Sequence, residues 1–315
     1  MPAHRFATPL AVLGLAASIP LLAAPAQQPP AAAPVPPLVR EGVTVKVSDH
    51  VYVIPDDNVP LVPNVGIVVG SRSTLIVDTG LGARNGATVM REVEKVAKGP
   101  HIFLVTTHVH PEHDLGAGGI RQTSMQMVRS QAQIDEIASG GLEMAKRFAT
   151  FSPLHAELLK DAEFHQADMH FGSEIDLELG GVRVKVMAMG FNHTRGDTAI
   201  YVETDRVLFS GDVSLALLPS VGNGASLDQW IASQNRLAAL KPLKVVPSHG
   251  PMGDASIMEK TKAFVTTVQR RAAELKRAGK TLDETVAALQ AELAPTFGAT
   301  PRMASGIRAA YNQAP

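Results

Sequence analysis

The chain has 315 residues and contains 11 histidines but no cysteine, which excludes disulfides and thiolate metal ligands. Its formal net charge is −1 without any block of like charges. This balance argues against a nucleic-acid partner, because phosphate contacts need a basic surface.

The first 26 residues have the pattern of a Sec-type secretory signal peptide. Arg5 precedes an apolar stretch over residues 7–24, and residues 24–26 (Ala-Pro-Ala) form a small-x-small cleavage signal. A twin-arginine signal is disfavoured because only one arginine precedes the apolar stretch. A membrane anchor is the alternative, and the stretch is short and interrupted for a membrane span. We therefore expect a periplasmic or secreted protein with no stable membrane anchor after cleavage.

Residues 27–39 form a tract rich in alanine, proline and glutamine, which is expected to be a disordered linker. The folded domain is expected over residues 40–315. Its length of about 275 residues suits one large α/β domain or two halves of a pseudo-repeat, and no short-period repeat is visible.

The first half of this domain has short β-forming segments separated by turns, followed by a helix. Valines at helical spacing predict the helix over residues 85–98, which Gly99 and Pro100 would end. The apolar run at residues 102–106 predicts a buried strand. The other strands expected here cover residues 43–47, 51–54, 65–69 and 74–77.

The second half begins with partial helical stripes over residues 130–160 and then returns to strands. A capping box at residues 281–284 predicts one more helix that extends to about residue 293. The other elements expected are strands at 175–179, 182–189, 198–202, 207–209 and 244–246 and helices at 227–240 and 257–276. This order predicts two sheets packed together with helices outside.

Three histidines and a glutamate lie within residues 108–113, directly after the expected buried strand. His108 and His110 project to the same side of an extended backbone, so they can bind one metal ion. Glu112 and His113 are offset along the chain and are better placed for a second ion. Imidazole and carboxylate ligands suit zinc or a similar divalent metal. A histidine-rich surface turn is the alternative, and the density of histidines argues against it.

Three more residues of metal-binding types follow, each where a predicted strand ends or in a glycine-bearing turn: His193, Asp212 and His249. Taken singly, each residue is most often part of a turn. Their order and their surroundings favour a metal site.

These motifs together resemble those of the metallo-β-lactamase superfamily. They lie in order at residues 76–80, 107–114, 192–197, 210–212 and 247–250. The resemblance implies an α/β protein with an αββα sandwich, in which two mixed β-sheets are flanked by helices. It also implies that the site lies at one edge of the sandwich, between the two sheets.

The resemblance further implies two bound metal ions, with zinc expected and another divalent metal as the alternative. The ligands implied for the first ion are His108, His110 and His193. Those implied for the second ion are Glu112, His113 and His249. Asp212 would bridge the two ions, and Asp78 would orient a ligand. Asp197 is a second candidate for fixing an imidazole, and either aspartate could cap a turn instead.

The chain departs from the family pattern at one ligand, because Glu112 stands where the family has aspartate. Glutamate carries its carboxylate one methylene further from the backbone, so the second metal position must be reshaped. Asp114 could substitute only with a local twist, so Glu112 remains the expected ligand.

The expected function is that of an exported zinc hydrolase whose metal-bridging hydroxide attacks an ester, lactone, thioester or amide carbonyl of a small-molecule substrate. Glu112 and Asp212 would orient the hydroxide and move its proton to the leaving group. Hydrolysis of β-lactams is an alternative that the export signal favours and Asp212 disfavours, since β-lactamases generally lack an aspartate there. A catalytically silent metal-binding or partner-binding protein of the same fold is the second alternative.

Two apolar segments that flank the motifs, residues 55–63 and 215–224, could line the substrate pocket or be packed connections. Trp230 is expected in the core. The histidines expected to be structural, because they lie away from the motifs, are His155, His165 and His170.

Overall fold

The computed structural model describes Met1 and residues 35–120, 124–215, 218, 220–222, 224–298 and 300–315. One compact unit extends from Val35 to Pro315. At its start, the Asn85 side chain accepts a hydrogen bond from the Val39 amide (2.8 Å) and donates one to the Pro37 carbonyl (2.9 Å). Apart from Met1, the predicted signal peptide lies outside the described residues, as do residues 27–34 of the predicted linker.

The first sheet has seven strands in the order β1-β2-β3-β4-β5-β6-β7. Neighbouring strands are antiparallel from β1 to β4 and parallel from β4 to β7, so the sheet is mixed. Its strands are β1 Val45–Lys46, β2 Val51–Ile54, β3 Val65–Val69, β4 Ser73–Val77, β5 His101–Val105, β6 Met125–Ser130 and β7 Met169–Phe171.

The second sheet has five strands in the order β12-β11-β10-β9-β8. It is also mixed, because β11 and β12 are parallel whereas its other neighbours are antiparallel. Its strands are β8 Glu174–Glu178, β9 Arg183–Gly190, β10 Asp197–Val202, β11 Val207–Gly211 and β12 Lys244–Pro247.

The two sheets pack face to face through valine, isoleucine, leucine and phenylalanine side chains of both sheets. A Cβ atom placed on Gly66 of β3 would lie 2.4 Å from the ring of Phe209 on β11. Only glycine therefore allows the Phe209 ring to lie against β3. The predicted contact of two sheets is confirmed.

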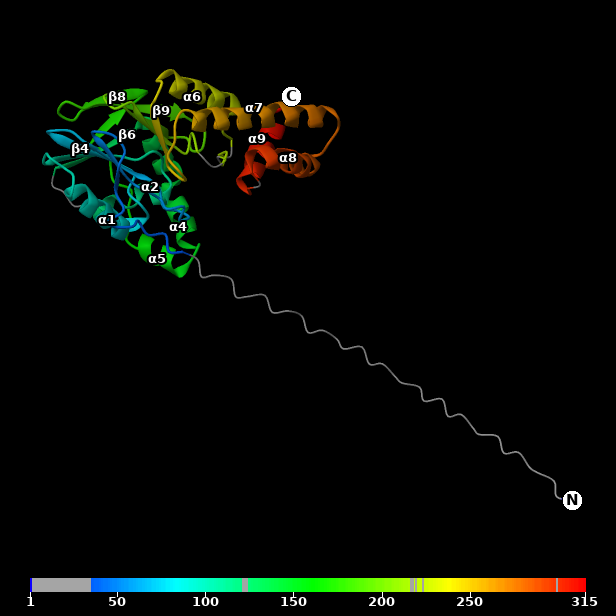
Figure 1. The fold of residues 1–315 in the computed structure, drawn as a ribbon, viewed down its shortest axis with the longest axis horizontal. Coiled ribbons are helices and arrows are strands. Elements are labelled where there is room, and N and C mark those ends of the chain that lie inside the picture. The colour runs from blue at the N-terminus through cyan, green and yellow to red at the C-terminus, as the bar shows by residue number, and fades with distance from the viewer. Residues whose placement is uncertain (2–34, 121–123, 216–217, 219, 223, 299) are drawn as a thin grey trace. The chain divides into compact units, whose positions relative to one another are not determined.

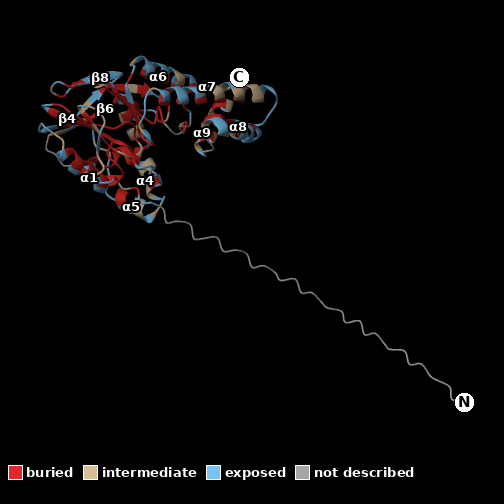
Figure 2. Cartoon of the chain, in the orientation of Figure 1, coloured by how far each residue is buried: buried red, intermediate tan, exposed pale blue. Residues whose placement is uncertain are grey.

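Helices cover the outer face of each sheet, as Figure 1 shows for α1 beside the first sheet and for α6 and α7 beside the second. Val89 and Val93 of α1 belong to the apolar cluster of the first sheet. The described helices are α1 Gly82–Glu94, α2 Pro111–Asp114, η1 Ala117–Gly119, α3 Gln131–Glu136, η2 Ile137–Gly141, α4 Leu142–Ala149, α5 Pro153–Leu159, α6 Leu227–Ala239, α7 Ser256–Arg277, α8 Leu282–Phe297 and α9 Arg302–Gln313. The buried residues lie mainly in the sheets and on the helix faces toward them (Figure 2). This arrangement confirms the predicted αββα sandwich.

The elements differ from the prediction in a few places. The helix predicted to end at residue 98 ends at Glu94 in α1, and β6, β7 and α9 were not predicted. The single helical region predicted over residues 130–160 is divided among α3, η2, α4 and α5. Trp230 lies in the core as predicted, with no exposed surface, and donates a hydrogen bond to the Val213 carbonyl (2.8 Å).

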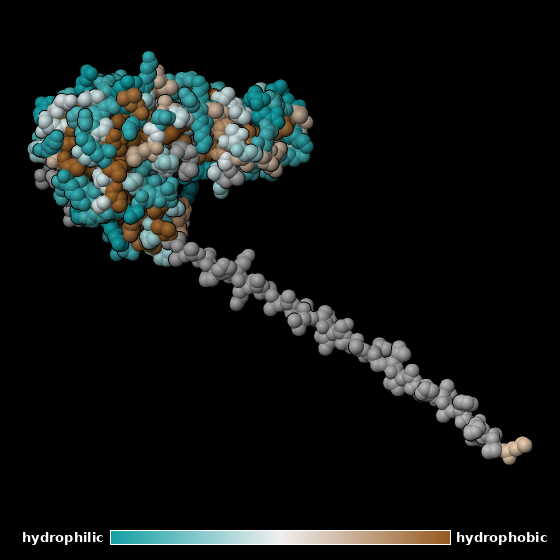
Figure 3. All heavy atoms as spheres, viewed as in Figure 1, coloured by the Kyte–Doolittle hydropathy of each residue, from teal (hydrophilic) through white to brown (hydrophobic). Residues whose placement is uncertain are grey.

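The surface in view in Figure 3 is mostly hydrophilic, with apolar residues in separate groups. Among the described residues from Val35 onward, the large apolar side chains that are exposed are Val35, Val45, Leu142, Phe151 and Leu243. Among the described residues, no helix has the length and apolar character that a membrane span needs.

Candidate metal centre

The segment that follows β5 carries His108 and His110, and its geometry follows from its sequence. Pro111 restricts the residue before it to extended backbone, and His110 is extended, with φ −63° and ψ 143°. Pro111 also begins the four-residue helix α2, because its missing N–H needs no partner at that position. Glu112 and His113 therefore lie on a helical turn, offset from the two preceding histidines as predicted.

Three imidazole nitrogens converge at the first group, which consists of His108, His110 and His193. The Nδ1 atom of His110 lies 3.1 Å from Nε2 of His108 and 3.1 Å from Nε2 of His193. Nitrogen ligands of a tetrahedral zinc ion lie about 3.3 Å apart, since each Zn–N bond is about 2.0 to 2.1 Å. The donor set therefore fits a zinc-like ion.

Burial, together with the neighbouring imidazoles, holds the pKa of both His108 and His110 well below the usual range. Both rings are therefore neutral at pH 7, the form in which imidazole binds a metal ion.

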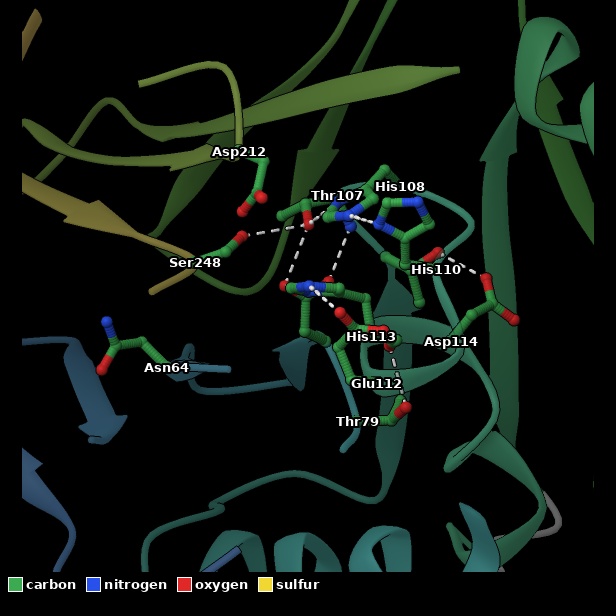
Figure 4. A network of polar contacts seen from close by, with 12 residues as sticks. Asn64, Thr79, Thr107, His108, His110, Glu112, His113, Asp114, Asp212 and Ser248 are labelled. Atoms are coloured by element: carbon green, nitrogen blue, oxygen red, sulfur yellow. Dashed lines mark hydrogen bonds and ion pairs between the residues drawn. The ribbon is translucent and has the colours of Figure 1, made fainter. Parts of the chain in front are cut away.

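A second group lies beside the first and contains Glu112, His113 and His249. Figure 4 shows that Asp212 approaches the histidines from the other sheet. Its Oδ2 atom lies 3.4 Å from Nε2 of His193, and its carboxylate also groups with His108 and His113. Asp212 therefore lies between the two groups.

Three polar atoms of this cluster are buried without a hydrogen-bond partner among the described residues: Glu112 Oε2, His113 Nε2 and Asp212 Oδ1. Each unpartnered buried atom costs free energy of about 1 to 3 kcal/mol, so such a concentration needs an explanation. A cation bound between them would be the partner of all three. Burial raises the pKa of Asp212, but the surrounding imidazoles and Arg302 outweigh it and hold the pKa well below the usual range.

Asp78 follows β4 and holds the His113 ring, the contact that the family resemblance implies. Its Oδ2 atom accepts a hydrogen bond from Nδ1 of His113 (2.9 Å), and its Oδ1 atom accepts one from the Thr107 amide (2.7 Å). Asp78 has a positive φ of 65°, an uncommon conformation for a residue with a side chain. Burial lowers the pKa of His113, but Asp78, Glu112 and Asp212 outweigh it and raise this pKa to about 9.

The other imidazoles are oriented by groups that sequence motifs do not identify. The Nδ1 atom of His193 donates to the Ser220 carbonyl (2.7 Å), and that of His249 donates to the Val62 carbonyl (2.9 Å). These bonds leave the Nε2 lone pair of each ring free for a metal ion. The partners are backbone atoms, which any residue type supplies.

Asp197 shapes the turn that carries His193 and does not bind its ring. Its carboxylate accepts hydrogen bonds from the amides of Asn192, His193 and Thr194 at 3.2, 2.6 and 2.9 Å. Two roles were considered for Asp197, to fix an imidazole or to cap a turn, and the structure shows the second. Burial, only partly offset by His193 and these bonds, raises the pKa of Asp197 to about 6.

Asp114 turns away from the cluster, so it does not replace Glu112. Its two carboxylate oxygens bind the guanidinium of Arg129, with Oδ1 at 2.8 Å from Nη2, and Thr106 donates a further hydrogen bond of 2.9 Å. Arg129 is 1% exposed and Asp114 is completely buried. This ion pair connects α2 to β6 beneath the site.

Asn64 was not predicted and connects the segment 55–63 to the turn of His249. Its amide nitrogen donates to the carbonyls of Pro247 (2.9 Å) and Gly250 (2.8 Å), and its Oδ1 atom accepts from the Asp56 amide. The segment is thus attached to this turn through Asp56 and through the Val62 carbonyl, which it supplies to His249, whereas residues 57, 58 and 60 are exposed. No motif distinguishes Asn64 in the sequence.

His155 lies nearer the site than its position in the sequence suggests. Phe151 lies between its ring and that of Phe148, with centroid distances of 5.8 and 4.9 Å, and Phe148 is 5.7 Å from His110. Its Nε2 atom is buried without a hydrogen-bond partner in the described part of the chain. Burial lowers the pKa of His155, and the charge of Glu112 opposes this effect. His155 therefore belongs to the surroundings of the site, whereas His170 is exposed on β7.

Comparison with known proteins agrees with this geometry. The model of the metallo-β-lactamase superfamily matches residues 58–249, which include every residue of the two groups. A human acyl-coenzyme A thioesterase is 28% identical over 48% of this chain and 57% of its own length. A linear primary-alkylsulfatase from Pseudomonas is 25% identical over 56% and 39%, and a type 2 metallo-β-lactamase from Bacteroides fragilis is 24% identical over 65% and 76%. The chain thus matches 57% and 39% of the lengths of the thioesterase and the alkylsulfatase.

Solved structures share the fold at low sequence identity. A metallo-β-lactamase from Pontibacter korlensis has a TM-score of 0.56 and 22% identity, covering 70% of this chain and 96% of its own. The inverting sec-alkylsulfatase of a Pseudomonas species has a TM-score of 0.66 and 16% identity, covering 86% and 50%. At these identities the likeness concerns the fold alone.

Proposed function

The chain belongs to the metallo-β-lactamase superfamily, and from this we propose that it is an exported metal-dependent hydrolase of a small-molecule ester, lactone, thioester or amide. The proposal depends on one observation above all, the convergence of three imidazole nitrogens at 3.1 Å beside unpartnered carboxylate oxygens. Such a cluster is costly to bury unless it binds cations.

The ligands proposed for the first ion are His108, His110 and His193. Those proposed for the second ion are Glu112, His113 and His249. Asp212 lies between the two groups and is proposed to bridge them. Zinc suits this mixture of imidazole and carboxylate ligands best, and the absence of cysteine removes the softer alternatives.

Divalent ions bound there would supply a polarised substrate carbonyl and a water made more acidic. The Asp212 carboxylate is ionised at neutral pH, because its pKa is held low, so its oxygens can bind a cation and accept a hydrogen bond from the attacking water. Glu112 Oε2 is the second buried acceptor. Both carboxylates would therefore orient the attacking water, and its proton would pass along them to the leaving group. Asp78 and the carbonyls of Ser220 and Val62 fix the imidazole tautomers.

Two features guide the choice of substrate. Asp212 favours general hydrolysis over β-lactam hydrolysis, whereas the relative from Bacteroides fragilis keeps β-lactams as a second candidate class. The other relatives are a thioesterase and a sulfatase, which adds thioesters and sulfate esters to the compounds worth testing. The signal-peptide pattern of residues 1–26 supports a periplasmic or secreted location.

The deciding experiment is turnover by the purified, zinc-loaded protein on a panel of esters, lactones, thioesters, sulfate esters and β-lactams. We expect hydrolysis of at least one ester, lactone or thioester, its loss on chelation and its return with zinc. If nitrocefin is the one compound of the panel that is hydrolysed, the protein would instead be assigned as a β-lactamase. Metal binding without any turnover would favour the catalytically silent protein.

The pH dependence of metal binding is expected to differ between the two sites. His113 has a pKa of about 9 in the metal-free protein, so binding the second ion at pH 7 must displace a proton from Nε2. His108 and His110 are already neutral. Through His113, affinity for the second ion should therefore rise about tenfold per pH unit up to pH 9, whereas His108 and His110 add no such dependence to the first ion above pH 7.

Calorimetric titration with zinc in buffers of different ionisation enthalpy measures this release directly. About one proton should accompany the second ion and almost none the first. Equal proton release for both ions would contradict the prediction.

A further inference from the structure

Four of the five imidazoles described for the metal centre are oriented by a hydrogen bond at the ring nitrogen that does not face the cluster. Three of these bonds, with Asp78 and two backbone carbonyls as acceptors, are given above. At the fourth ring, the Thr107 hydroxyl donates to Asp78 and therefore accepts from Nδ1 of His108 (3.1 Å). Such bonds fix the tautomer and the orientation of a metal-binding histidine.

His110 differs from these four rings. Its Nδ1 atom faces His108 and His193, at 3.1 Å from the Nε2 atom of each. In the described part of the chain, no acceptor is hydrogen-bonded to its own Nε2 atom. The terminal torsion of a histidine side chain has a broad range, so a ring without such a bond needs another contact to fix its orientation.

Phe148 of helix α4 makes this contact. Its ring centroid lies 5.7 Å from that of His110, with an angle of 38° between the two ring planes. This separation is within the range of about 4.5 to 7 Å that aromatic pairs favour. The rings of His108 and His193 also contact His110, edge-on at 4.7 Å each, but they belong to the metal group itself. Among the ring contacts of the described residues, Phe148 is thus the one partner of His110 from outside that group.

The Phe148 ring is itself held in place. Within α4, all of which the structure describes, Phe148 is the one buried side chain, and it is 5% exposed. It belongs to an apolar cluster whose other buried members are Leu81, Leu115, Leu158 and Leu159. Leu115 follows α2 directly, and α4 lies against α2 (Figure 1). The cluster therefore fixes Phe148 relative to the short helix that begins after His110.

We propose that Phe148 is a positioning residue, whose ring fixes the orientation of His110 and so holds Nδ1 in place for the first metal ion. The proposal rests on the metal centre of the function proposed above and names a residue that determines its affinity for that ion. An apolar contact has here the role that a hydrogen-bond acceptor has at the other four imidazoles. The packed ring leaves the imidazole few orientations, so little conformational entropy is lost when the ion binds.

The test measures the zinc affinity of the first group by competition with a chromophoric chelator. It uses a His249→Ala background, in which the second group keeps two of its three ligands and one tightly bound ion is expected. In this background, Phe148→Leu should weaken zinc binding about tenfold, because the effect resembles removal of the group that orients a ligand. Leucine keeps most of the apolar volume and removes the flat ring. Unchanged zinc affinity in Phe148→Leu would overturn the proposal.

Leu159→Ala in the same background is the matched control. Leu159 is a buried member of the same cluster and lies on α5, so this variant also removes apolar volume from the cluster. Both variants should lower the unfolding temperature of the metal-free protein. Zinc affinity should fall in Phe148→Leu and stay unchanged in Leu159→Ala. An equal loss of affinity in both would assign the effect to general packing and contradict the proposal.

Cobalt(II) gives a spectroscopic readout that needs no turnover, because its visible absorption depends on the arrangement of its ligands. We expect Phe148→Leu to change the position or intensity of the cobalt band of the background protein, and Leu159→Ala to leave both unchanged. If no compound of the panel is hydrolysed but these differences are found, the hydrolase function fails and the role of Phe148 stands. If the background protein binds neither zinc nor cobalt, the metal centre and the role of Phe148 are both wrong.

Discussion

Replacing His110 by alanine should lower kcat/KM on the substrate found in the panel by on the order of 10³-fold. The reason is geometric, because Nδ1 of His110 lies 3.1 Å from the nearest nitrogens of both His108 and His193 and completes their group. Without it, two imidazoles remain for the first ion. Kinetics and metal analysis of the same preparations measure the result, and bound zinc should fall from about two ions per chain to about one.

His170→Ala is the matched control, since this histidine is exposed on β7. It should keep both the metal content and the turnover of the wild-type protein. Thermal unfolding of both metal-free variants identifies a folding defect. The first-site assignment fails if His110→Ala retains full metal and full turnover.

Replacing Asp114 by alanine should lower the free energy of unfolding by about 3 to 5 kcal/mol, the largest stability effect expected in the chain. Arg129 is 1% exposed, so the variant leaves its guanidinium charged and buried without the carboxylate that binds it. The double variant Asp114→Leu with Arg129→Met removes both charges and should recover most of the loss, because neither charge is then buried alone. Denaturant unfolding of the metal-free proteins measures all three values.

A surface pair provides the comparison. Glu143 and Lys146 on α4 form an ion pair of 2.8 Å with side chains 77% and 61% exposed. Glu143→Ala should change the free energy of unfolding by less than about 1 kcal/mol. An effect of Asp114→Ala as small as this would mean that the buried pair contributes little. Since Asp114 also ends α2, the variant should weaken zinc binding by Glu112 and His113 as well.

Most strands and the packing order of the fold could be predicted from the sequence. The elements that were not predicted have physical explanations. The strands from β8 to β11 alternate or cluster β-formers between clear turns, so their positions were predicted within one or two residues. The strand β7 has three residues, too few for a periodic pattern. The helix α9 contains Gly306, which lowers the helix propensity of its sequence, and it is attached through Ser305 to the chain after β11.

The residues of the candidate site were proposed from the sequence by their types and their spacing in motifs. The residues proposed as ligands lie in short motifs at strand ends, because metal binding needs particular side chains at particular spacings. The contacts made by the carbonyls of Ser220 and Val62 could not be predicted from the sequence, because every residue has a carbonyl. Asn64 and His155 are single residues outside the motifs. What distinguishes them is their unpartnered or bridging atoms, which the folded chain alone displays.

The sequence by itself determined the superfamily, the sandwich and the set of imidazoles and carboxylates, because periodicity and motif spacing are local properties. The tertiary structure decided how these groups are used. It turned Asp114 toward Arg129, placed the Asp197 carboxylate against the backbone of the His193 turn, and brought Asp212 to His193. The physical reason is that hydrogen-bond partners, burial and electric field depend on residues that lie far apart along the chain and meet only when the two sheets and α9 pack together.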